Sequence, residues 1–483
     1  MKRIGPLILA VLFTLSGCGI FAGTDYTGRV SFDRPLPIPP LQEGTVDDQG
    51  RREFTLTARE GSSQLVNGMT TPTWGFNGDY LGPTLRAAPG ERVRVNVTNE
   101  LGEATSVHWH GMHLPAAMDG GPHQEVQPGG TWQPEWEINQ PPATLWYHPH
   151  PHEATEKHVY RGLAGLFLID EPTQHLPSEY GIDDIPLIVQ DKRFTETGEL
   201  VFDHSSAVGT LGESILANGI EGAYLDATTE KVRLRLLNAS TARILTFAFE
   251  DEREFAQIAT DGGLMEAPNS TRQLTLSPGE RAEIVVELTP GEEVNLQSHP
   301  TPGYLLGAGS GLSDSFDILQ IRAADRLSPS PALPAELSDI DWLRASDAVR
   351  QRPMRLSNRS INGSEMDMSR IDEVVTAGST EIWTVSAADG YPHNFHIHDV
   401  QFHVLDIDGE PPGPHLRGWK DTILLEPHKE HRLIMRFSNY ADPDVPYMYH
   451  CHLLWHEDEG MMGQFVVVDE GQPPGSPSGS HHH

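Results

Sequence analysis

Hydrophobic and polar residues alternate along three similar stretches of the chain. These stretches are ERVRVNVTN at residues 91–99, EKVRLRLLNAS at residues 230–240 and TEIWTVSA at residues 380–387. A period of two, with Val, Leu or Ile at every second position, is the pattern of a half-buried β-strand. Each stretch follows an Asn-Gly dipeptide, and these dipeptides recur about every 140 residues. The pattern therefore predicts one β unit repeated three times.

Proline-glycine turns separate the predicted strands, for example at Pro89 and Pro278. Short strands joined by such turns, in units of this length, predict an all-β chain of three consecutive β-sandwich domains. We place the three domains at residues 50–172, 173–324 and 353–470. Residues 325–352 break the alternation and are expected to connect the second domain to the third.

The first residues predict export. Lys2 and Arg3 precede an apolar run, Ile4–Leu15, that is too short to span a bilayer, which needs about 20 apolar residues. The run ends in Leu-Ser-Gly-Cys, which resembles a bacterial lipoprotein signal, in which the cysteine (here Cys18) becomes the lipidated first residue. An ordinary signal peptide with an incidental cysteine is the alternative. We expect residues 1–18 to be a lipoprotein signal peptide, and the protein to lie in the periplasm or at the extracellular face, anchored to the envelope through Cys18.

Two flanking segments lie outside the predicted domains. Residues 19–49 contain a proline-rich run and are expected to form a tether. Residues 471–483 are expected to form a flexible tail. Its three final histidines are typical of a tag and are excluded from the chemistry.

The charge of the chain excludes one class of partner. The chain has 34 lysines and arginines against 68 acidic residues, a formal net charge of −34, so nucleic-acid phosphate would be repelled. Cys18 and Cys451 are its two cysteines. Because Cys18 falls in the signal segment, a disulfide framework is also excluded.

Histidines form four clusters in the sequence. They account for 24 of 483 residues, so chance would produce about one His-x-His pair. Two clusters lie in the first repeat and two in the third, whereas the second repeat contains only isolated histidines. The clusters are His108 and His110; His148 and His150; His393, His396 and His398; and His450 and His452.

The spacing within the clusters suits metal binding. On a strand, residues i and i+2 face the same way, so each His-x-His pair presents two imidazoles to one side. Cys451 lies between His450 and His452 and must face the opposite way. With His456, Met461 and one further histidine, Cys451 completes the two-histidine, one-cysteine set with a weak axial methionine that marks a blue-copper centre. Calcium and magnesium are disfavoured because no carboxylates cluster here, and so many ligands exceed a tetrahedral zinc site.

The chain resembles a three-domain bacterial multicopper oxidase over essentially its whole mature length. The matching motifs are HWHG, WYHPH, HNFHIH and HCHLLWHEDEGMM, of which the last is highly specific. The resemblance implies three cupredoxin-like domains, each a Greek-key β-sandwich, and four copper ions. It implies a type 1 copper bound by His393, Cys451, His456 and Met461. It also implies a type 2 copper bound by His108 and His396, and a type 3 pair bound by His110, His150 and His452 on one side and by His148, His398 and His450 on the other.

The resemblance also implies the reaction. One-electron donors would be oxidised at the type 1 site, and electrons would pass through Cys451 to the other three coppers, where O2 is reduced to water. Asp119 and Glu457 match the acidic residues with which the family supplies protons, and their role would be that of general acids. Solvated surface acids are the alternative for both residues.

The electron donor is predicted to be a phenol or a similar organic molecule, as in a laccase or a bilirubin oxidase. The alternative is a cuprous oxidase for copper tolerance, which carries a methionine-rich insert over the type 1 site. Between residues 363 and 393 only Met366 and Met368 occur, and Tyr391 stands where those enzymes have a copper-binding methionine. Because thioethers recruit Cu(I), the laccase-like hypothesis is favoured.

Without such an insert, the edge of His456 is expected to be open to donors. Asp389, four residues before His393, is expected either to orient that imidazole or to bind a cationic substrate. A non-catalytic copper-storage or binding protein is a remote alternative, because every ligand position of the family is filled.

Overall fold

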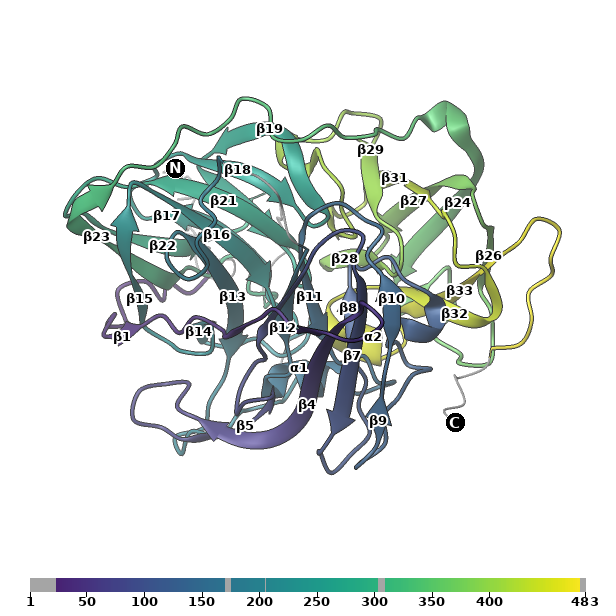
Figure 1. Ribbon diagram of the computed structural model, residues 1–483, viewed down its shortest axis with the longest axis horizontal. Coiled ribbons are helices and arrows are strands. Elements are labelled where there is room, and N and C mark those ends of the chain that lie inside the picture. Colours follow the sequence, from purple (N-terminus) through teal and green to yellow (C-terminus); the bar gives the residue numbers. More distant parts are fainter. Residues whose placement is uncertain (1–22, 170–174, 205, 303–308, 478–483) are drawn as a thin grey trace, which may run out of the picture.

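The computed structural model describes residues 23–169, 175–204, 206–302 and 309–477 (Figure 1). Its described part consists mainly of strands, so the predicted all-β class is confirmed. Six sheets form three sandwiches that follow one another along the chain. The predicted signal segment, with Cys18, lies outside the described residues.

The first sandwich packs two sheets around a core that includes Leu85, Val95 and Phe167. Along β7 (Arg92–Asn99), buried residues alternate with more exposed ones, which confirms the half-buried strand predicted there. One sheet runs β10-β7-β4-β3, with β5 beside β4 and β9 beside β7. Its other strands are β3 (Thr45–Val46), β4 (Arg52–Ser63), β5 (Thr71–Phe76), β9 (Thr131–Trp132) and β10 (Glu135–Glu137). The second sheet runs through β2 (Leu41–Gln42), β6 (Thr84–Ala87), β12 (Gly165–Ile169), β11 (Thr144–His148) and β8 (His108–His110).

The second sandwich buries polar positions as well as apolar ones. No residue of β16 (Lys231–Asn238) is exposed although its sequence alternates, because Arg233 and Arg235 form buried ion pairs with Glu283 and Asp184. One sheet runs through β1 (Arg34–Pro35), β15 (Ala223–Thr229), β23 (Phe316–Ser328), β22 (Glu293–His299), β17 (Leu245–Phe249) and β20 (Gln273–Leu276). The other runs through β14 (Ser214–Ala217), β13 (Asp184–Lys192), β16, β21 (Arg281–Glu287), β18 (Phe255–Thr260) and β19 (Gly263–Thr271).

The third sandwich has a core that includes Trp383, Phe395 and Phe465. One sheet runs through β25 (Ser360–Ile361), β24 (Ala348–Ser357), β27 (Thr380–Ala387), β31 (Glu430–Arg436) and β29 (Phe402–Ile407). The other runs through β26 (Glu373–Thr376), β33 (Met462–Val468), β32 (Asp442–His450), β28 (His393–Ile397) and β30 (Thr422–Leu425).

Short helices join the first and third sandwiches. The carboxylate of Asp458, at the end of α2 (Leu454–Asp458), accepts hydrogen bonds of 2.9 Å from the backbone N–H groups of Thr155 and Glu156 in α1 (Thr155–Arg161). These groups would otherwise lack partners at the helix start. Three 3₁₀ turns are η1 (Ala116–Met118), η2 (Ala345–Asp347) and η3 (Pro414–Leu416). Among the described residues, no helix combines the length and apolar character needed to cross a bilayer.

The segment expected to be a tether is packed against the domains from residue 24 onward. β1 pairs with β15, β2 with β6, and β3 with β4. The ring of Tyr26 stacks on Phe316 with 4.6 Å between centroids. These strands have two residues each, too short to show a periodic pattern, so they could not be recognised from the sequence.

Candidate functional site

Four strands bring the histidine clusters together where the first and third sandwiches meet. β8 pairs with β11, which places His148 opposite His108. β28 pairs with β32, which places His396 opposite His450. In Figure 1, β8 and β28 lie near the centre of the molecule. All of the predicted histidine ligands are buried.

Cys451 forms a centre of its own with two histidines. The Nδ1 atoms of His393 and His456 lie 3.7 Å and 3.6 Å from the sulfur. Met461 is also fully buried. Its backbone lies next to both residues, because its carbonyl accepts a hydrogen bond from the Cys451 N–H and its N–H donates to the His456 carbonyl. These are soft sulfur and imidazole donors in the proportion that a blue-copper centre uses.

The outer nitrogens of these two imidazoles are held by hydrogen bonds. His393 Nε2 lies 2.8 Å from Asp389 Oδ1, and His456 Nε2 donates to the Ala207 carbonyl at 2.9 Å. Both rings therefore turn Nδ1 toward Cys451. Burial raises the pKa of the Cys451 thiol, but the facing His393 and His456 outweigh it and bring that pKa down to about 5. The thiolate, which is the metal-binding form, is thus favoured.

Three imidazoles form a first histidine group: His110, His148 and His452. His110 Nδ1 and His452 Nε2 each lie 3.4 Å from His148 Nε2. His148 Nδ1 donates to the Pro149 carbonyl, so its Nε2 carries no proton and faces its neighbours with a lone pair. Lone pairs at this distance repel each other unless a cation lies between them.

A second histidine group has the same geometry. His450 Nε2 lies 3.2 Å from His150 Nε2 and 3.3 Å from His398 Nε2. Metal–nitrogen bonds of about 2.0 Å in tetrahedral geometry hold imidazole nitrogens about 3.3 Å apart. Both groups therefore have the spacing that one bound metal ion each would require.

His108 and His396 complete the cluster. Each donates from Nδ1 to a backbone carbonyl, of Asp119 at 3.0 Å and of Asp421 at 2.9 Å. Their Nε2 atoms are buried without a hydrogen-bond partner in the described structure. An orphaned buried acceptor is costly in a protein interior, and a metal ion would satisfy both. With His110, they form a further candidate metal-binding group.

Burial favours the neutral form of most of these histidines; at His450 the facing Glu457 outweighs burial and raises the pKa. Burial, together with the neighbouring imidazoles, lowers the pKa of the side chains in this cluster well below the ordinary value; this holds for His110, His148, His396, His398 and His452. The neutral imidazole is the form that binds metals. The residues therefore fit a cluster of metal ions beside the separate cysteine centre.

The grouping differs from the expected one at two positions. The sequence comparison with the family assigned His150 to the group of His110 and His452, and His148 to the group of His398 and His450. In the structure these two histidines are exchanged. They lie on the same chain segment two residues apart, so the sequence alone could not decide between the two partners.

The two predicted acids lie beside the cluster and are buried. Asp119 Oδ2 accepts a hydrogen bond of 2.7 Å from His398 Nδ1. Glu457 Oε2 lies 3.0 Å from His450 Nδ1, and its Oε1 lies 3.4 Å from His150 Nδ1. The alternative that both are solvated surface acids is therefore wrong.

The expectation that the edge of His456 is open to solvent is also wrong. Its ring is 3% exposed, because the loop of the second sandwich around Ala207 covers it. On the other side of the centre, the Asp389 side chain is 17% exposed, and Tyr391 beside it is 52% exposed. The accessible approach therefore lies at Asp389 and His393.

Several residues of the site were missed by sequence reasoning. The amide oxygen of Asn394 accepts a hydrogen bond of 2.6 Å from the His452 N–H, and its amide nitrogen donates to Ser277 Oγ and the Pro278 carbonyl. Asp421 lies 3.0 Å from His110 Nε2. Asn394 could have been recognised from the sequence because it lies within the HNFHIH motif. Nothing in the sequence around Ser277 or Pro278 indicates that they belong to the site.

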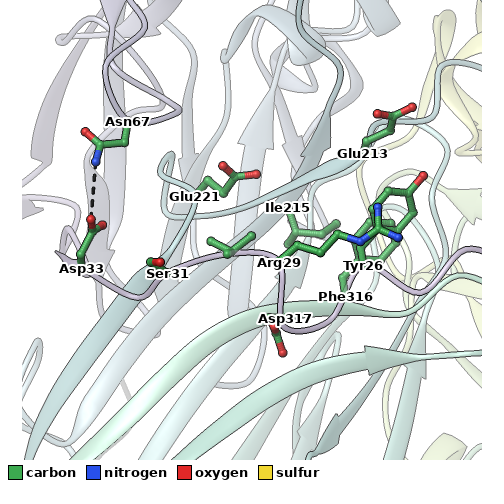
Figure 2. Close-up of a pocket in the computed structure, with 11 residues that line it drawn as sticks. Tyr26, Arg29, Ser31, Asp33, Asn67, Glu213, Ile215, Glu221, Phe316 and Asp317 are labelled. Carbon is green, nitrogen blue, oxygen red and sulfur yellow. Dashed lines mark hydrogen bonds between the residues drawn. The ribbon is translucent and has the colours of Figure 1, made fainter.

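Two cavities have different relations to the cluster. The cavity in Figure 2, of about 370 Å³, lies between the N-terminal segment and the second sandwich and contains none of the histidines. A second cavity of about 370 Å³ is lined by His113 and Asp399. Asp399 directly follows His398, and its Oδ2 has no hydrogen-bond partner in the described structure. This second cavity is therefore lined by the residue that follows a histidine of the cluster in the chain.

Comparisons with known proteins agree with this arrangement. Two sequence-family models, both described as multicopper oxidase, match residues 57–174 and 339–471. The chain is 37% identical over 439 residues to the multicopper oxidase mco of Staphylococcus haemolyticus, covering 89% of this chain and 92% of that protein. It is 36% identical over 448 residues to the cell division protein FtsP of Photorhabdus laumondii, covering 90% and 93%.

Solved structures are similar over the same length. The laccase-like multicopper oxidase CueO of Ochrobactrum sp., described as active toward lignin model compounds, has a TM-score of 0.82 at 34% identity, covering 90% of this chain and 100% of that one. The laccase of Pediococcus acidilactici has a TM-score of 0.82 at 32% identity, covering 90% and 94%.

Proposed function

The chain belongs to the multicopper oxidase family, and on that premise we propose that it is a laccase-like oxidase of phenolic or similar organic donors. Members of the family are oxidoreductases that use copper and O2 and act on small molecules. The observation that carries the proposal is the juxtaposition of a buried two-histidine, one-cysteine centre with two three-histidine groups and a His108–His396 pair.

Four copper ions are proposed. His393, Cys451, His456 and Met461 would hold one; His108 and His396 would hold the second; and the two histidine groups would hold the third and fourth. Bound copper would store and transfer single electrons, so that four donor molecules together reduce one O2 to two waters. The described histidines that line this cluster are buried, which keeps bulk water and competing reactions out.

Cys451 connects the two parts of the site through its own backbone. Its side chain faces His393 and His456, whereas the adjacent His450 and His452 belong to the two histidine groups. The connection between the centres is therefore a continuous covalent path through adjacent residues. Such a connection suits electron transfer between the centres, whereas a protein that only stores copper would not need it.

Asp119 and Glu457 are proposed to pass on the protons that the reaction consumes; the facing His150 and His450 outweigh burial and lower the pKa of Glu457, so this carboxylate would relay a proton rather than store one. Each lies against histidines of the cluster, and both are buried. Positioned acids of this kind contribute roughly 10²- to 10⁴-fold to rate. The cavity at His113 and Asp399 is proposed as the route by which water leaves.

The donor is proposed to approach at Asp389. Its Oδ1 accepts from His393 and from the Tyr391 N–H, and its Oδ2 accepts from the Asn358 N–H. Because a carboxylate has about four lone-pair sites and this one is partly open to solvent, a phenol hydroxyl can donate to it next to the cysteine centre. A dedicated cuprous site is less favoured, because Met366 and Met368 are the methionines in the segment over this centre and Tyr391 replaces a thioether.

The test is oxygen uptake by fully copper-loaded protein with a methoxyphenol, with and without added Cu(II). Fast oxygen uptake whose rate does not change when copper is added would support direct oxidation of organic donors. Uptake that requires added copper would favour the cuprous-oxidase alternative. No uptake by protein that holds four coppers would contradict the proposed oxidase and favour a non-catalytic storage or binding role.

Export and a lipid anchor at Cys18 stay predictions of the sequence. Radiolabelled palmitate incorporated into the wild-type chain, and lost from a Cys18→Ser variant, would support the anchor. Equal labelling of both chains would contradict it.

A further inference from the structure

Arg281 is a buried cation that the second sandwich inserts beside the histidine cluster. It begins β21, and its side chain is fully buried. The guanidinium has five N–H donors, and the structure supplies an acceptor for each. Two go to the carboxylate of Asp421, at 2.7 Å each, and the other three go to the carbonyls of Thr144, Gly279 and Asp261, at 2.9 to 3.1 Å.

Asp421 in turn contacts imidazoles of two different groups. Its Oδ1 accepts from His110 Nε2 at 3.0 Å and from Thr422 Oγ1 at 2.9 Å. Its backbone carbonyl accepts from His396 Nδ1 at 2.9 Å. These contacts fix which nitrogen of each ring carries the proton, and so leave His110 Nδ1 and His396 Nε2 free to face the cluster.

Arg281 fixes the orientation of the Asp421 carboxylate, because its two parallel hydrogen bonds engage both carboxylate oxygens at once. Without this fork the carboxylate could rotate, and Oδ1 would no longer be held opposite His110 Nε2. Lys420, next to Asp421, does not substitute, because its ammonium is engaged by Asp261 at 2.8 Å and by Glu280 at 3.0 Å. Arg281 is therefore the cation that forms an ion pair with Asp421.

The close packing at Gly111 is independent evidence that this geometry is specified. Gly111 follows His110 and has a φ of +85°, a backbone conformation that favours glycine. A Cβ atom there would lie 2.5 Å from Asp421 Oδ2 and 2.7 Å from Arg281 Nη2. The chain beside His110 thus leaves room for the paired carboxylate and guanidinium only because it has no side chain.

We propose that Arg281 is a positioning residue for the copper cluster, supplied by the domain that contributes none of the proposed copper ligands. Through Asp421 it holds His110 and His396 in the orientation that binds metal. This inference rests on the proposed copper assignment. It gives the second sandwich a defined part in the reaction, since an arginine from this sandwich orients ligands that the other two provide.

The test is an Arg281→Lys variant of the full chain, loaded with copper. Lysine keeps the charge but cannot form the two parallel hydrogen bonds to Asp421. We expect the blue band of the cysteine centre and its reduction by a donor without O2 to be unchanged. The near-ultraviolet band of the type 3 pair and the copper content should fall. Oxygen uptake should fall roughly 10- to 100-fold, the usual effect of losing such a supporting contact.

The matched control is Arg243→Lys. Arg243 is also a buried arginine of the second sandwich, and it pairs with Asp191 away from the cluster. The Arg243→Lys variant should have a lower melting temperature without a selective loss of the type 3 band. If Arg281→Lys keeps four coppers and a normal type 3 band, or if both lysine variants lose all copper signals equally, the proposal is overturned.

An Asp421→Asn variant keeps the test decisive if Arg281→Lys does not fold. It should show the same selective loss, and the double variant should be little worse than either single one, because both act through one contact. An intact cluster in Asp421→Asn would overturn the proposal. Wild-type protein that never acquires a type 3 band would contradict the proposed function first, so the two failures can be told apart.

Discussion

His456 Nε2 donates a hydrogen bond of 2.9 Å to the backbone carbonyl of Ala207. The two residues belong to different sandwiches, and the contact closes the edge of the imidazole that a donor would otherwise reach. The opposite imidazole of the cysteine centre, His393, meets solvent through the partly exposed Asp389. The expectation of an open His456 edge is therefore not met, and donor binding should depend on Asp389.

An Asp389→Asn variant should lower kcat/KM for a methoxyphenol roughly tenfold. A neutral amide accepts the phenol and His393 hydrogen bonds less strongly than a carboxylate, a difference of about 1.4 kcal/mol. Steady-state oxygen uptake measures the effect. Asp408→Asn, on an exposed turn of the same domain, is the control. Equal kinetics for the two variants would mean that donors enter elsewhere.

Replacing Cys451 by serine should abolish the blue band and donor-driven oxygen uptake. A hydroxyl is neither a soft ligand nor a thiolate, so the cysteine centre cannot hold copper in the same way. The histidine groups should still bind copper, because Cys451 faces away from them. Copper analysis and absorption spectra check this result; persistence of the blue band would contradict the assignment.

Asp119→Asn and Glu457→Gln should each slow oxygen uptake by roughly 10²- to 10⁴-fold while leaving donor-driven reduction of the cysteine centre intact. Both changes keep the shape of the side chain but remove a group that can deliver a proton. Stopped-flow reduction without O2, compared with steady-state uptake, separates the two steps. Glu470→Gln, on the exposed surface, should change neither rate.

Removing copper with a chelator should lower the melting temperature. Metal that binds only the folded chain stabilises it, by about 2.7 kcal/mol per site at a hundredfold excess over Kd. Without copper, the imidazoles within the His148 group face one another with unshared lone pairs, and so do those within the His450 group. Scanning calorimetry before chelation, after it and after copper is restored provides the comparison. An unchanged midpoint would argue against a metal in these groups.

The buried environment of His403 predicts that the stability of the protein depends on pH. It lies between Trp419 and Trp342, with ring centroids at 3.7 Å and 4.4 Å, and burial lowers its pKa from 6.5 to about 4. Between these pH values the unfolded chain binds a proton that the folded chain does not. The contribution of His403 to the free energy of unfolding should therefore be constant above about pH 6.5 and fall by about 3 kcal/mol toward pH 4.

A His403→Phe variant should keep the stacking and lose this part of the pH dependence. Denaturant unfolding of the copper-loaded protein at pH 7 and pH 5 measures the difference. His175→Gln, which is exposed, is the control and should retain the wild-type slope. If His403→Phe has the same slope as the wild type, the acid sensitivity comes from other groups.

Much of the site could be predicted from the sequence, because its chemistry is local. The His-x-His spacing on strands and the cysteine between two histidines are properties of adjacent residues, and they indicated two kinds of metal centre before any contact was known. Strand alternation likewise predicted β7. It did not predict that both faces of β16 are buried, because a second layer of ion pairs comes from distant residues such as Glu283.

What the sequence determined by itself is the inventory: an all-β chain, three repeats, twelve candidate ligands and two acids. What only the tertiary structure decided is which distant groups share a space. His148 and His150 are two residues apart, and only the packing of the first sandwich against the third assigns each to its group. The cover over His456 and the contact of Arg281 with Asp421 both come from the second sandwich, which has no histidine cluster of its own. Side chains that meet across domain boundaries leave no periodic or local pattern, so their contacts become visible only when the chain is folded.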